Sequence, residues 1–205
     1  LFIFIFMSVI HFGLCDWSYL ELGKYKWSIS ITHGLNIVFG IIFFHTSETF
    51  EIFAFLSNSS FIHLQNYLFI AYFFYFILLL RYSYLAFIVP KLRWGLLEMI
   101  IVLLIVFLTE PLVGFSIYFC FIHTFKHVKS ILKDTSKHLS NNKFVSITTI
   151  SFTLLTWIGG SLAIVYLYNN YSFEESFIKT LFIGLAALTL PHMTLVDVFY
   201  RRKFN

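Results

Sequence analysis

The chain has 205 residues, of which 59% are hydrophobic and only 12% are charged. A soluble domain of this length carries about twice that share of charged residues, so the composition excludes an ordinary soluble protein and indicates an integral membrane protein. The net charge is +4, but no soluble module carries a basic patch, which argues against nucleic-acid binding. Cys15 and Cys120 lie in apolar segments and form no CxxC motif. Neither a disulfide framework nor a cysteine metal site is therefore expected.

Apolar runs close to the length of about 20 residues that a membrane-crossing helix needs recur along the chain. They predict an all-α fold, a polytopic membrane helix bundle that forms one domain over residues 1–205. The seven predicted transmembrane segments are 1–16, 28–47, 65–88, 94–109, 111–132, 144–168 and 176–200.

The first segment is short and begins without an initiator Met. We therefore expect a chain that is truncated at its N-terminus. A cleaved signal peptide is the alternative explanation, but it requires a basic region and a small-residue cleavage site that the sequence lacks.

All but one of the Lys and Arg residues fall in alternate connections between these segments, with Lys179 as the exception. By the positive-inside rule those connections are cytoplasmic, which predicts a multi-pass protein of the cell membrane with a cytoplasmic C-terminus. This orientation places five histidines from four segments at one depth, in the cytoplasmic half of the bilayer. They are His11, His33, His123, His127 and His192.

His123 and His127 lie in the stretch FSIYFCFIHTFKHVKS at 115–130. Residues four apart share one face of a helix, so both imidazoles can bind one metal ion. The alternative is a pair of hydrogen-bonded histidines near the membrane interface. A site of histidines without cysteine suits iron, zinc or copper. The stretch lacks the Glu of an HExxH motif, so zinc peptidase chemistry is not expected.

Two aspartates stand five residues after histidines, Asp16 after His11 and Asp197 after His192. An aspartate beside a metal-binding histidine commonly fixes the ring by accepting its second N–H. Five residues correspond to roughly 140° around a helix, so each aspartate is expected to contact a histidine on another segment. Alternatively, both aspartates are interfacial residues that face water. Pro191 precedes His192 and is expected to kink the last segment.

Aromatic residues crowd the segment 65–88. Most aromatic side chains of a membrane protein face lipid or pack between helices, but this group could also line a tunnel for a long, flat, apolar ligand. The residues are Tyr67, Phe69, Tyr72, Phe73, Phe74, Tyr75 and Phe76.

Four motifs, taken in order, carry a family resemblance. They are HFGLCD at 11–16, FFHTSETFEIFAFL at 43–56, YFCFIHTFKH at 118–127 and LPHMTLVD at 190–197. Together they resemble the Brp/Blh family of membrane β-carotene 15,15'-dioxygenases. The resemblance implies cleavage of β-carotene by molecular oxygen at its central double bond, which gives two retinal molecules, at a non-haem Fe(II) ion. Retinal as the product implies a functional link to a retinal-binding rhodopsin.

The resemblance also implies site residues. Carried over by motif, the iron ligands are His11, His123 and His127. The supporting residues of the same layer are His192, Asp16 and Asp197, of which His192 is also a candidate ligand. Family members carry a further histidine-containing segment upstream, so we expect an incomplete coordination sphere in this chain. His33 matches no ligand motif and stays an unassigned polar residue.

The alternative from another functional class is a non-enzymatic seven-helix protein that binds metal, haem or retinal. An opsin needs a lysine within its last helix for a Schiff base, and Lys179 lies near the outer end of segment 176–200 without an evident buried carboxylate partner. A haem carrier would give a Soret band, and a metal transporter would take up metal without consuming oxygen.

Overall fold

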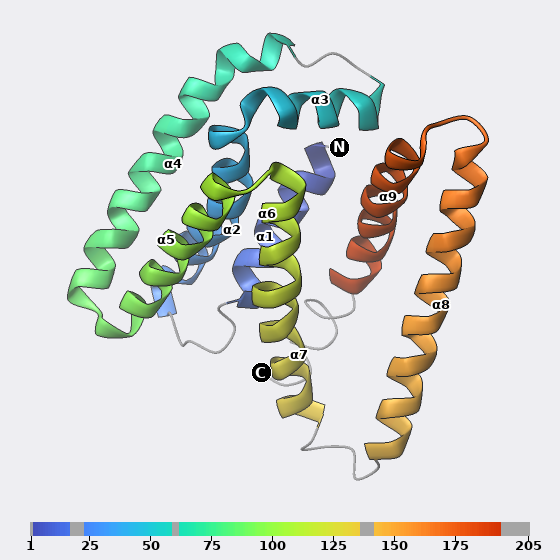
Figure 1. Ribbon diagram of the computed structural model, residues 1–205. Coiled ribbons are helices and arrows are strands. Elements are labelled where there is room, and N and C mark those ends of the chain that lie inside the picture. The colour runs from blue at the N-terminus through green and yellow to red at the C-terminus, as the bar shows by residue number, and fades with distance from the viewer. Residues whose placement is uncertain (1, 17–22, 59–61, 136–141, 194–205) are drawn as a thin grey trace. The chain divides into compact units, whose positions relative to one another are not determined.

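The computed structural model describes residues 2–16, 23–58, 62–135 and 142–193, and these are helical apart from short connections (Figure 1). The elements are α1 (Phe2–Asp16), η1 (Gly23–Tyr25), α2 (Lys26–Phe44), α3 (Thr46–Ser57), α4 (Ile62–Ile88), η2 (Pro90–Leu92), α5 (Arg93–Leu108), α6 (Pro111–Ile117), η3 (Tyr118–His123), α7 (Thr124–Thr135), α8 (Asn142–Tyr168) and α9 (Phe173–Met193). The prediction of an all-α fold is confirmed for these residues.

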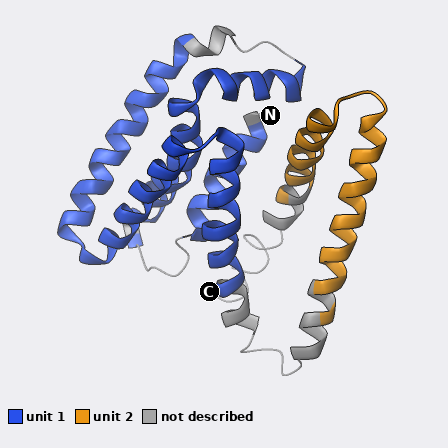
Figure 2. Ribbon diagram, viewed as in Figure 1, with its two compact units in different colours: residues 1–133 blue, residues 134–205 orange. Residues whose placement is uncertain are grey.

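The chain divides into two compact units, residues 1–133 and 134–205 (Figure 2). The first contains α1 to α6, η3 and most of α7, and the second contains the hairpin of α8 and α9. The single membrane domain expected from the sequence stays a prediction.

Three of the described helices are long and apolar enough to cross a membrane, over Lys26–Phe44, Asn66–Ile88 and Ile150–Tyr168. They are compatible with membrane insertion. Each of the seven predicted segments contains helix, but the structure does not give seven clear spans. α1 is a shorter apolar helix, and α5 has only 16 residues.

The connection after the segment 28–47 contains a helix of its own, α3. α2 ends at Phe44, because the φ of −133° and ψ of 49° at His45 leave the helical region, and α3 begins at Thr46. His45 Nε2 donates a hydrogen bond of 2.8 Å to the Val106 carbonyl, which fixes the break against the end of α5. α3 ends at Asn58 with a φ of 51°, a left-handed conformation that asparagine tolerates at helix ends.

Two glycines bring the backbones of α1 and α2 into contact. A Cβ atom added to Gly13 would lie 1.9 Å from the Ser30 carbonyl oxygen, and one added to Gly34 would lie 1.9 Å from the Val9 carbonyl oxygen. The two helices therefore cross where each presents a glycine to the other's backbone, as in closely packed membrane helix pairs. This crossing positions the end of α1 against the middle of α2.

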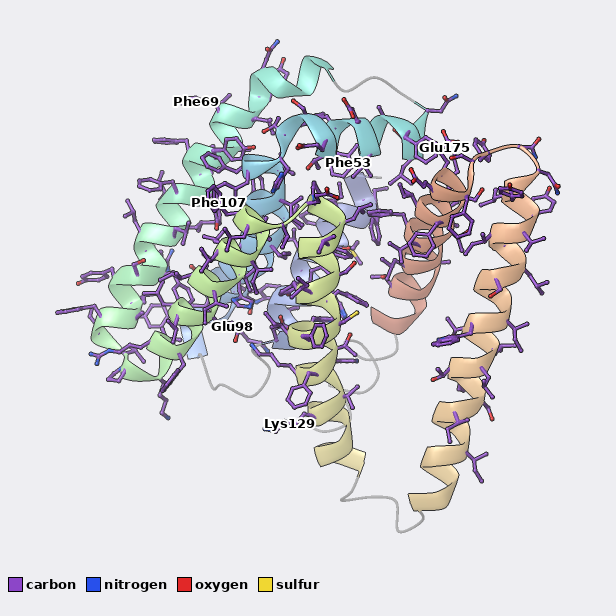
Figure 3. All side chains as sticks on the ribbon, in the orientation of Figure 1. Phe53, Phe69, Glu98, Phe107, Lys129 and Glu175 are labelled. Atoms are coloured by element: carbon purple, nitrogen blue, oxygen red, sulfur yellow. The ribbon has the colours of Figure 1, made fainter. Side chains whose placement is uncertain are left out.

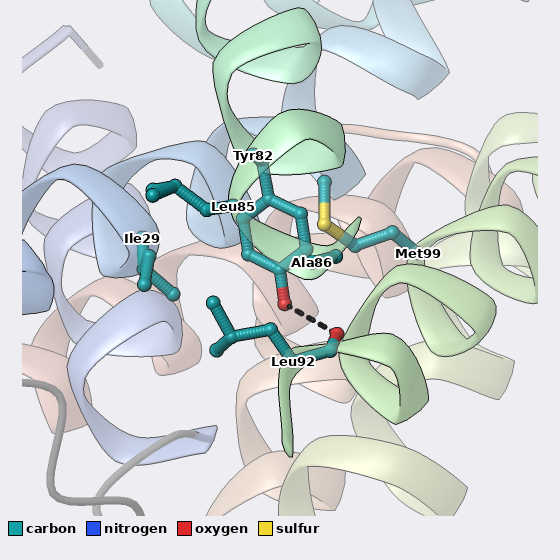
Figure 4. Packing of buried hydrophobic residues seen from close by; sticks show 6 residues of the cluster. All are labelled: Ile29, Tyr82, Leu85, Ala86, Leu92 and Met99. Atoms are coloured by element: carbon teal, nitrogen blue, oxygen red, sulfur yellow. Dashed lines mark hydrogen bonds between the residues drawn. The ribbon is translucent and has the colours of Figure 1, made fainter. Parts of the chain in front are cut away.

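Two hydrophobic clusters hold α5 against the rest of the first unit. The first cluster joins α2, α4 and α5, and Tyr82 in it donates to the Leu92 carbonyl at 3.4 Å (Figure 4). Its members are Ile29, Tyr82, Leu85, Ala86, Leu92 and Met99. The second cluster joins α1, α2, α5 and η3, and its members are Phe12, Ile37, Val102, Val106 and Tyr118. The second cluster lies directly beside the buried polar residues described below.

The aromatic residues of α4 do not line a tunnel within the part of the first unit that the structure describes. Phe69 is 79% exposed and points away from the neighbouring helices (Figure 3). Tyr67, Phe73, Phe74 and Phe76 are exposed as well. Tyr72 and Tyr75 instead pack on Phe39 of α2. These rings fit the alternative that they face lipid or pack helices.

In the second unit, α8 and α9 form an antiparallel hairpin (Figure 2). Ser172 and Glu175 cap the start of α9, since the Glu175 N–H donates to Ser172 Oγ and the Ser172 N–H donates to Glu175 Oε2. α9 continues through Pro191 and His192 to Met193. The side chains of Pro191 and His192, and Asp197 as a whole, lie outside the described residues, so the predicted kink and their predicted roles stay predictions.

Candidate metal centre

Three of the predicted ligands meet where α1 lies beside η3 and α7. The ring centres of His11 and His123 are 5.3 Å apart, those of His123 and His127 are 5.9 Å apart, and those of His11 and His127 are 6.1 Å apart. His11 and His123 are buried, and His127 is partly exposed. The structure thus places His11 beside the pair on the later helix, while the role of the three as metal ligands stays a prediction.

A π-helical turn positions His123. η3 interrupts the α-helical rod between α6 and α7, and its i→i+5 hydrogen bonding returns residues five apart to the same side. Tyr118 and His123 are five apart, and both are buried on the side that faces α1. In a regular α-helix the same two residues would diverge by roughly 140°, and only one could face α1. Turns of this kind are frequent at functional sites.

Asp16, the last residue of α1, accepts a hydrogen bond from each of these side chains. His123 Nδ1 donates to Asp16 Oδ1 at 2.8 Å, and the Tyr118 hydroxyl donates to Asp16 Oδ2 at 2.8 Å. The Asp16 carboxylate has no solvent exposure. Its partner is thus a histidine on another segment, as the spacing to His11 predicted. With Nδ1 engaged, Nε2 is the atom through which His123 would bind a metal.

A second polar group continues from Asp16 towards α5. His33 of α2 is buried, and its Nε2 lies 3.7 Å from Asp16 Oδ2 and 3.3 Å from Glu98 Oε1. The Lys126 ammonium of α7 contacts both Glu98 oxygens. Asp16, His33 and Glu98 form the one described group in which three ligand atoms lie within 4.8 Å of one another.

The two groups differ in how well they fit a divalent cation. The oxygens of Glu98 are paired with an ammonium and those of Asp16 with His123 and Tyr118. A metal ion among them would meet the positive charge of Lys126 and displace existing hydrogen bonds. The residues of this group are therefore better described as a network of ion pairs and hydrogen bonds than as a metal site.

The three imidazoles are the more suitable ligands, because the ammonium of Lys126 is paired with the other group. A ring nitrogen binds a divalent first-row metal at about 2.1 Å, so rings at tetrahedral angles around one ion have centres roughly 5 Å apart. The closest pair, His11 and His123, has about this spacing, and the two separations to His127 are larger. The ring nitrogens of the three do not all lie within 4.8 Å of one another, as the ligand atoms of the other group do. Imidazole nitrogens suit iron, copper and zinc. The carboxylate on Nδ1 of His123 is the usual support for a metal-binding histidine.

Aromatic rings surround His123. Phe12 of α1 lies edge to face at a centre distance of 4.7 Å, and Phe119 stacks at 5.6 Å. Phe115 stacks on Phe119 at 5.8 Å one turn earlier. Phe115 and Phe119 are partly exposed. The site is therefore apolar on this side and offers flat ring faces next to the histidines.

Sequence reasoning gave no role to three residues of this centre. His33 was left unassigned, and neither Glu98 nor Tyr118 was singled out. Glu98 carried a usable signal, because it is an acidic residue within the apolar segment 94–109, where an unpaired charge is costly. Tyr118 carried none, since its place beside Asp16 depends on the π-helical turn.

Comparisons with known proteins bear on the whole chain. A family model described as Beta-carotene 15,15'-dioxygenase matches residues 1–200. A curated protein named Beta-carotene 15,15'-dioxygenase, from Uncultured marine bacterium 66A03, is 30% identical over 202 residues, which cover 98% of this chain and 72% of the relative. No solved structure matches the chain significantly.

Proposed function

Because the chain belongs to the β-carotene 15,15'-dioxygenase family, a family of carotenoid-cleaving dioxygenases, we propose that it cleaves β-carotene with molecular oxygen at the central double bond. The products are two molecules of retinal. Membership in an enzyme family argues against the alternative of a non-enzymatic carrier or receptor. The family name supports the substrate, and the histidine layer of the first unit supports the place of the chemistry.

The proposed cofactor is Fe(II), held by His11, His123 and His127. The observation that carries this assignment is the meeting of three imidazoles from two segments, with ring centres 5.3 to 6.1 Å apart and a buried carboxylate on one of them. When bound, the ion supplies the site at which molecular oxygen is activated. Neutral imidazoles are the ligands that leave an iron ion its full positive charge.

The protein's own residues orient the metal-binding histidines and offer a surface for the substrate. Asp16 holds His123 in the tautomer with its proton on Nδ1, and Tyr118 holds the second oxygen of the same carboxylate. Phe119 and Phe115 present stacked faces beside the histidines, against which a conjugated polyene can lie flat. The surrounding cluster of Phe12, Ile37 and Val102 keeps water from this end of the site.

A membrane location follows from the same proposal. β-Carotene is apolar along its whole length and partitions into the bilayer, so an enzyme that acts on it gains from a site at membrane depth. The three apolar helices and the basic connections support a multi-pass protein of the cell membrane with its C-terminus in the cytoplasm. His11, His123 and His127 then lie in the cytoplasmic half, which substrate reaches laterally between helices. Retinal formed there is available to a retinal-binding rhodopsin.

The test is conversion in cells that make β-carotene. We expect the protein to turn such cells from orange towards colourless while retinal accumulates, and His123→Ala or His127→Ala to abolish both effects, since each substitution removes a metal bond. His45→Gln is the matched control, because His45 bonds the Val106 carbonyl away from the layer and glutamine keeps a donor. Full retinal production by either alanine variant would overturn the ligand assignment. Aldehydes of unequal length would overturn cleavage at the central bond.

A further inference from the structure

A series of polar contacts beside the histidine layer starts and ends on the helical rod formed by η3 and α7. It runs from His123 to Asp16, from Asp16 to His33, from His33 to Glu98, and from Glu98 to Lys126. These residues come from η3, α1, α2, α5 and α7. Lys126 follows His123 by one helical turn, so the chain of contacts starts and ends on the same rod.

Two anchors one turn apart fix the rotation of a helix about its own axis. His123 is held by α1 through Asp16, and Lys126 is held by α5 through Glu98. His127 follows Lys126 directly, so its direction is set by the same two anchors. Tyr118 and His123 both contact Asp16. The Lys126–Glu98 pair therefore holds the rod on a second helix, next to His127.

His33 connects the two anchors. Asp16 and Glu98 offer carboxylate oxygens within 4.8 Å of each other in a buried region, where like charges repel strongly. His33 stands between them with Nε2 at 3.3 Å from Glu98 and 3.7 Å from Asp16. An imidazole placed between two carboxylates offsets their repulsion and keeps Asp16 an acceptor for His123.

We propose that Glu98 and His33 are positioning residues for the metal centre, which act through Asp16 on His123 and through Lys126 on His127. This inference rests on the proposed function, because it assumes that these two histidines hold the ion. In this proposal, the contacts of Glu98, His33 and Lys126 orient the histidines towards one another already in the metal-free protein.

The experiment measures metal binding by the purified full chain in detergent. Glu98→Gln keeps the size of the side chain and removes its charge, and we expect it to weaken Fe(II) binding by about 10-fold, in the range found for lost supporting partners. The visible spectrum of bound Co(II), which reports ligand geometry without turnover, should shift in the same variant. Glu48→Gln is the control, because Glu48 is an exposed glutamate of α3 with a 61% exposed side chain.

A double variant tests the route through Asp16. Because Glu98 acts in part through Asp16, adding Glu98→Gln to Asp16→Asn should weaken Fe(II) binding by a smaller factor than Glu98→Gln does in the unaltered protein, whereas independent effects would multiply. Full multiplication of the two effects would overturn the proposal that Glu98 acts through Asp16. Should Glu98→Gln fail to insert, Glu98→Gln combined with Lys126→Met removes both charges of the pair, and the same weakening and the same Co(II) shift are expected.

The outcomes separate this inference from the proposed function. Absence of Fe(II) binding by the unaltered protein would reject the proposed function itself. Normal Fe(II) binding by the unaltered protein and equal binding by Glu98→Gln would reject only the positioning role. Loss of binding in Glu98→Gln and in His33→Gln, with binding retained in His127→Ala, would instead place the ion among Asp16, His33 and Glu98 and overturn the inference.

Discussion

The helix pair α1–α2 and the helix α8 use similar residues with opposite results. α2 and α8 are both apolar enough to cross a membrane, and both contain glycine. Half of the apolar window of α2 is buried, including Ser30, Thr32, His33 and Asn36, whereas none of the window of α8 over Ile150–Tyr168 is buried. Of these two apolar helices, the one that buries polar side chains is the one whose backbone lies in contact with a neighbouring helix.

The glycines show what makes this difference. At Gly34 a Cβ atom would meet the Val9 backbone at 1.9 Å, but at Gly159 and Gly160 no atom lies within 4 Å. Close approach of α1 shields His33 and Asp16 from solvent, and shielding strengthens each hydrogen bond and charge contact around them. The crossing of α1 and α2 is thus a condition for the polar network, and the network in turn orders the histidines.

The largest effect should come from removing that approach. Gly34→Ala places a methyl group against a backbone oxygen that cannot move by itself, so we expect the free energy of unfolding to fall by about 3 kcal/mol or more and Fe(II) binding to be lost. Gly160→Ala in α8 is the matched change and should leave stability equal or raise it by up to about 1 kcal/mol. Thermal unfolding in detergent and iron content measure both. Equal behaviour of the two variants would erase the distinction between the helices.

A smaller effect is expected from one hydroxyl group. Tyr118→Phe removes the hydrogen bond to Asp16 Oδ2 and leaves a buried carboxylate short of a donor, so stability should fall by about 2 kcal/mol. Fe(II) affinity should fall with it, because Asp16 also orients His123. Tyr166→Phe alters an exposed tyrosine of α8 and should change stability by less than about 0.5 kcal/mol. An unaltered Tyr118→Phe variant would show that Asp16 needs only His123.

The sequence was sufficient for the helices and for part of the metal centre. The four-residue spacing of His123 and His127 and the shared depth of His11 follow from helix periodicity and loop charge, which are local properties. That Asp16 contacts a histidine of another segment also follows from an angle around one helix. The helix α3 is not among the predicted segments, and the His45 residue that precedes it bonds the Val106 carbonyl, a contact over 61 residues that no local pattern contains.

The rest of the centre depends on contacts that no local pattern contains. Glu98 and Lys126 are 28 residues apart, and Tyr118 reaches Asp16 across 102 residues. Tyr118 and His123 share a face because the π-helical turn η3 contains one more residue than an α-helical turn. The apolar sequence of this turn does not predict that it is π-helical. The prediction of seven spans relied on length and hydropathy, which do not distinguish a spanning helix from a short or interrupted one.

The smallest effect is expected in the hairpin, where stability rests on exposed local contacts. The Ser172 backbone N–H donates to Glu175, and this bond together with the Ser172 hydroxyl holds the pKa of Glu175 below its usual value. The folded state therefore favours the ionised carboxylate, and its stabilising effect is present above the ordinary glutamate pKa and is lost as the pH falls through the lowered one.

Ser172→Ala should lower the free energy of unfolding by about 1 kcal/mol through loss of the cap. Glu175→Gln should flatten the dependence of stability on pH below about pH 5, whereas Glu174→Gln in the same turn should retain it. Thermal unfolding in detergent across that range measures the three variants, and a pH dependence in Glu175→Gln equal to that of the unaltered protein would contradict the capping role.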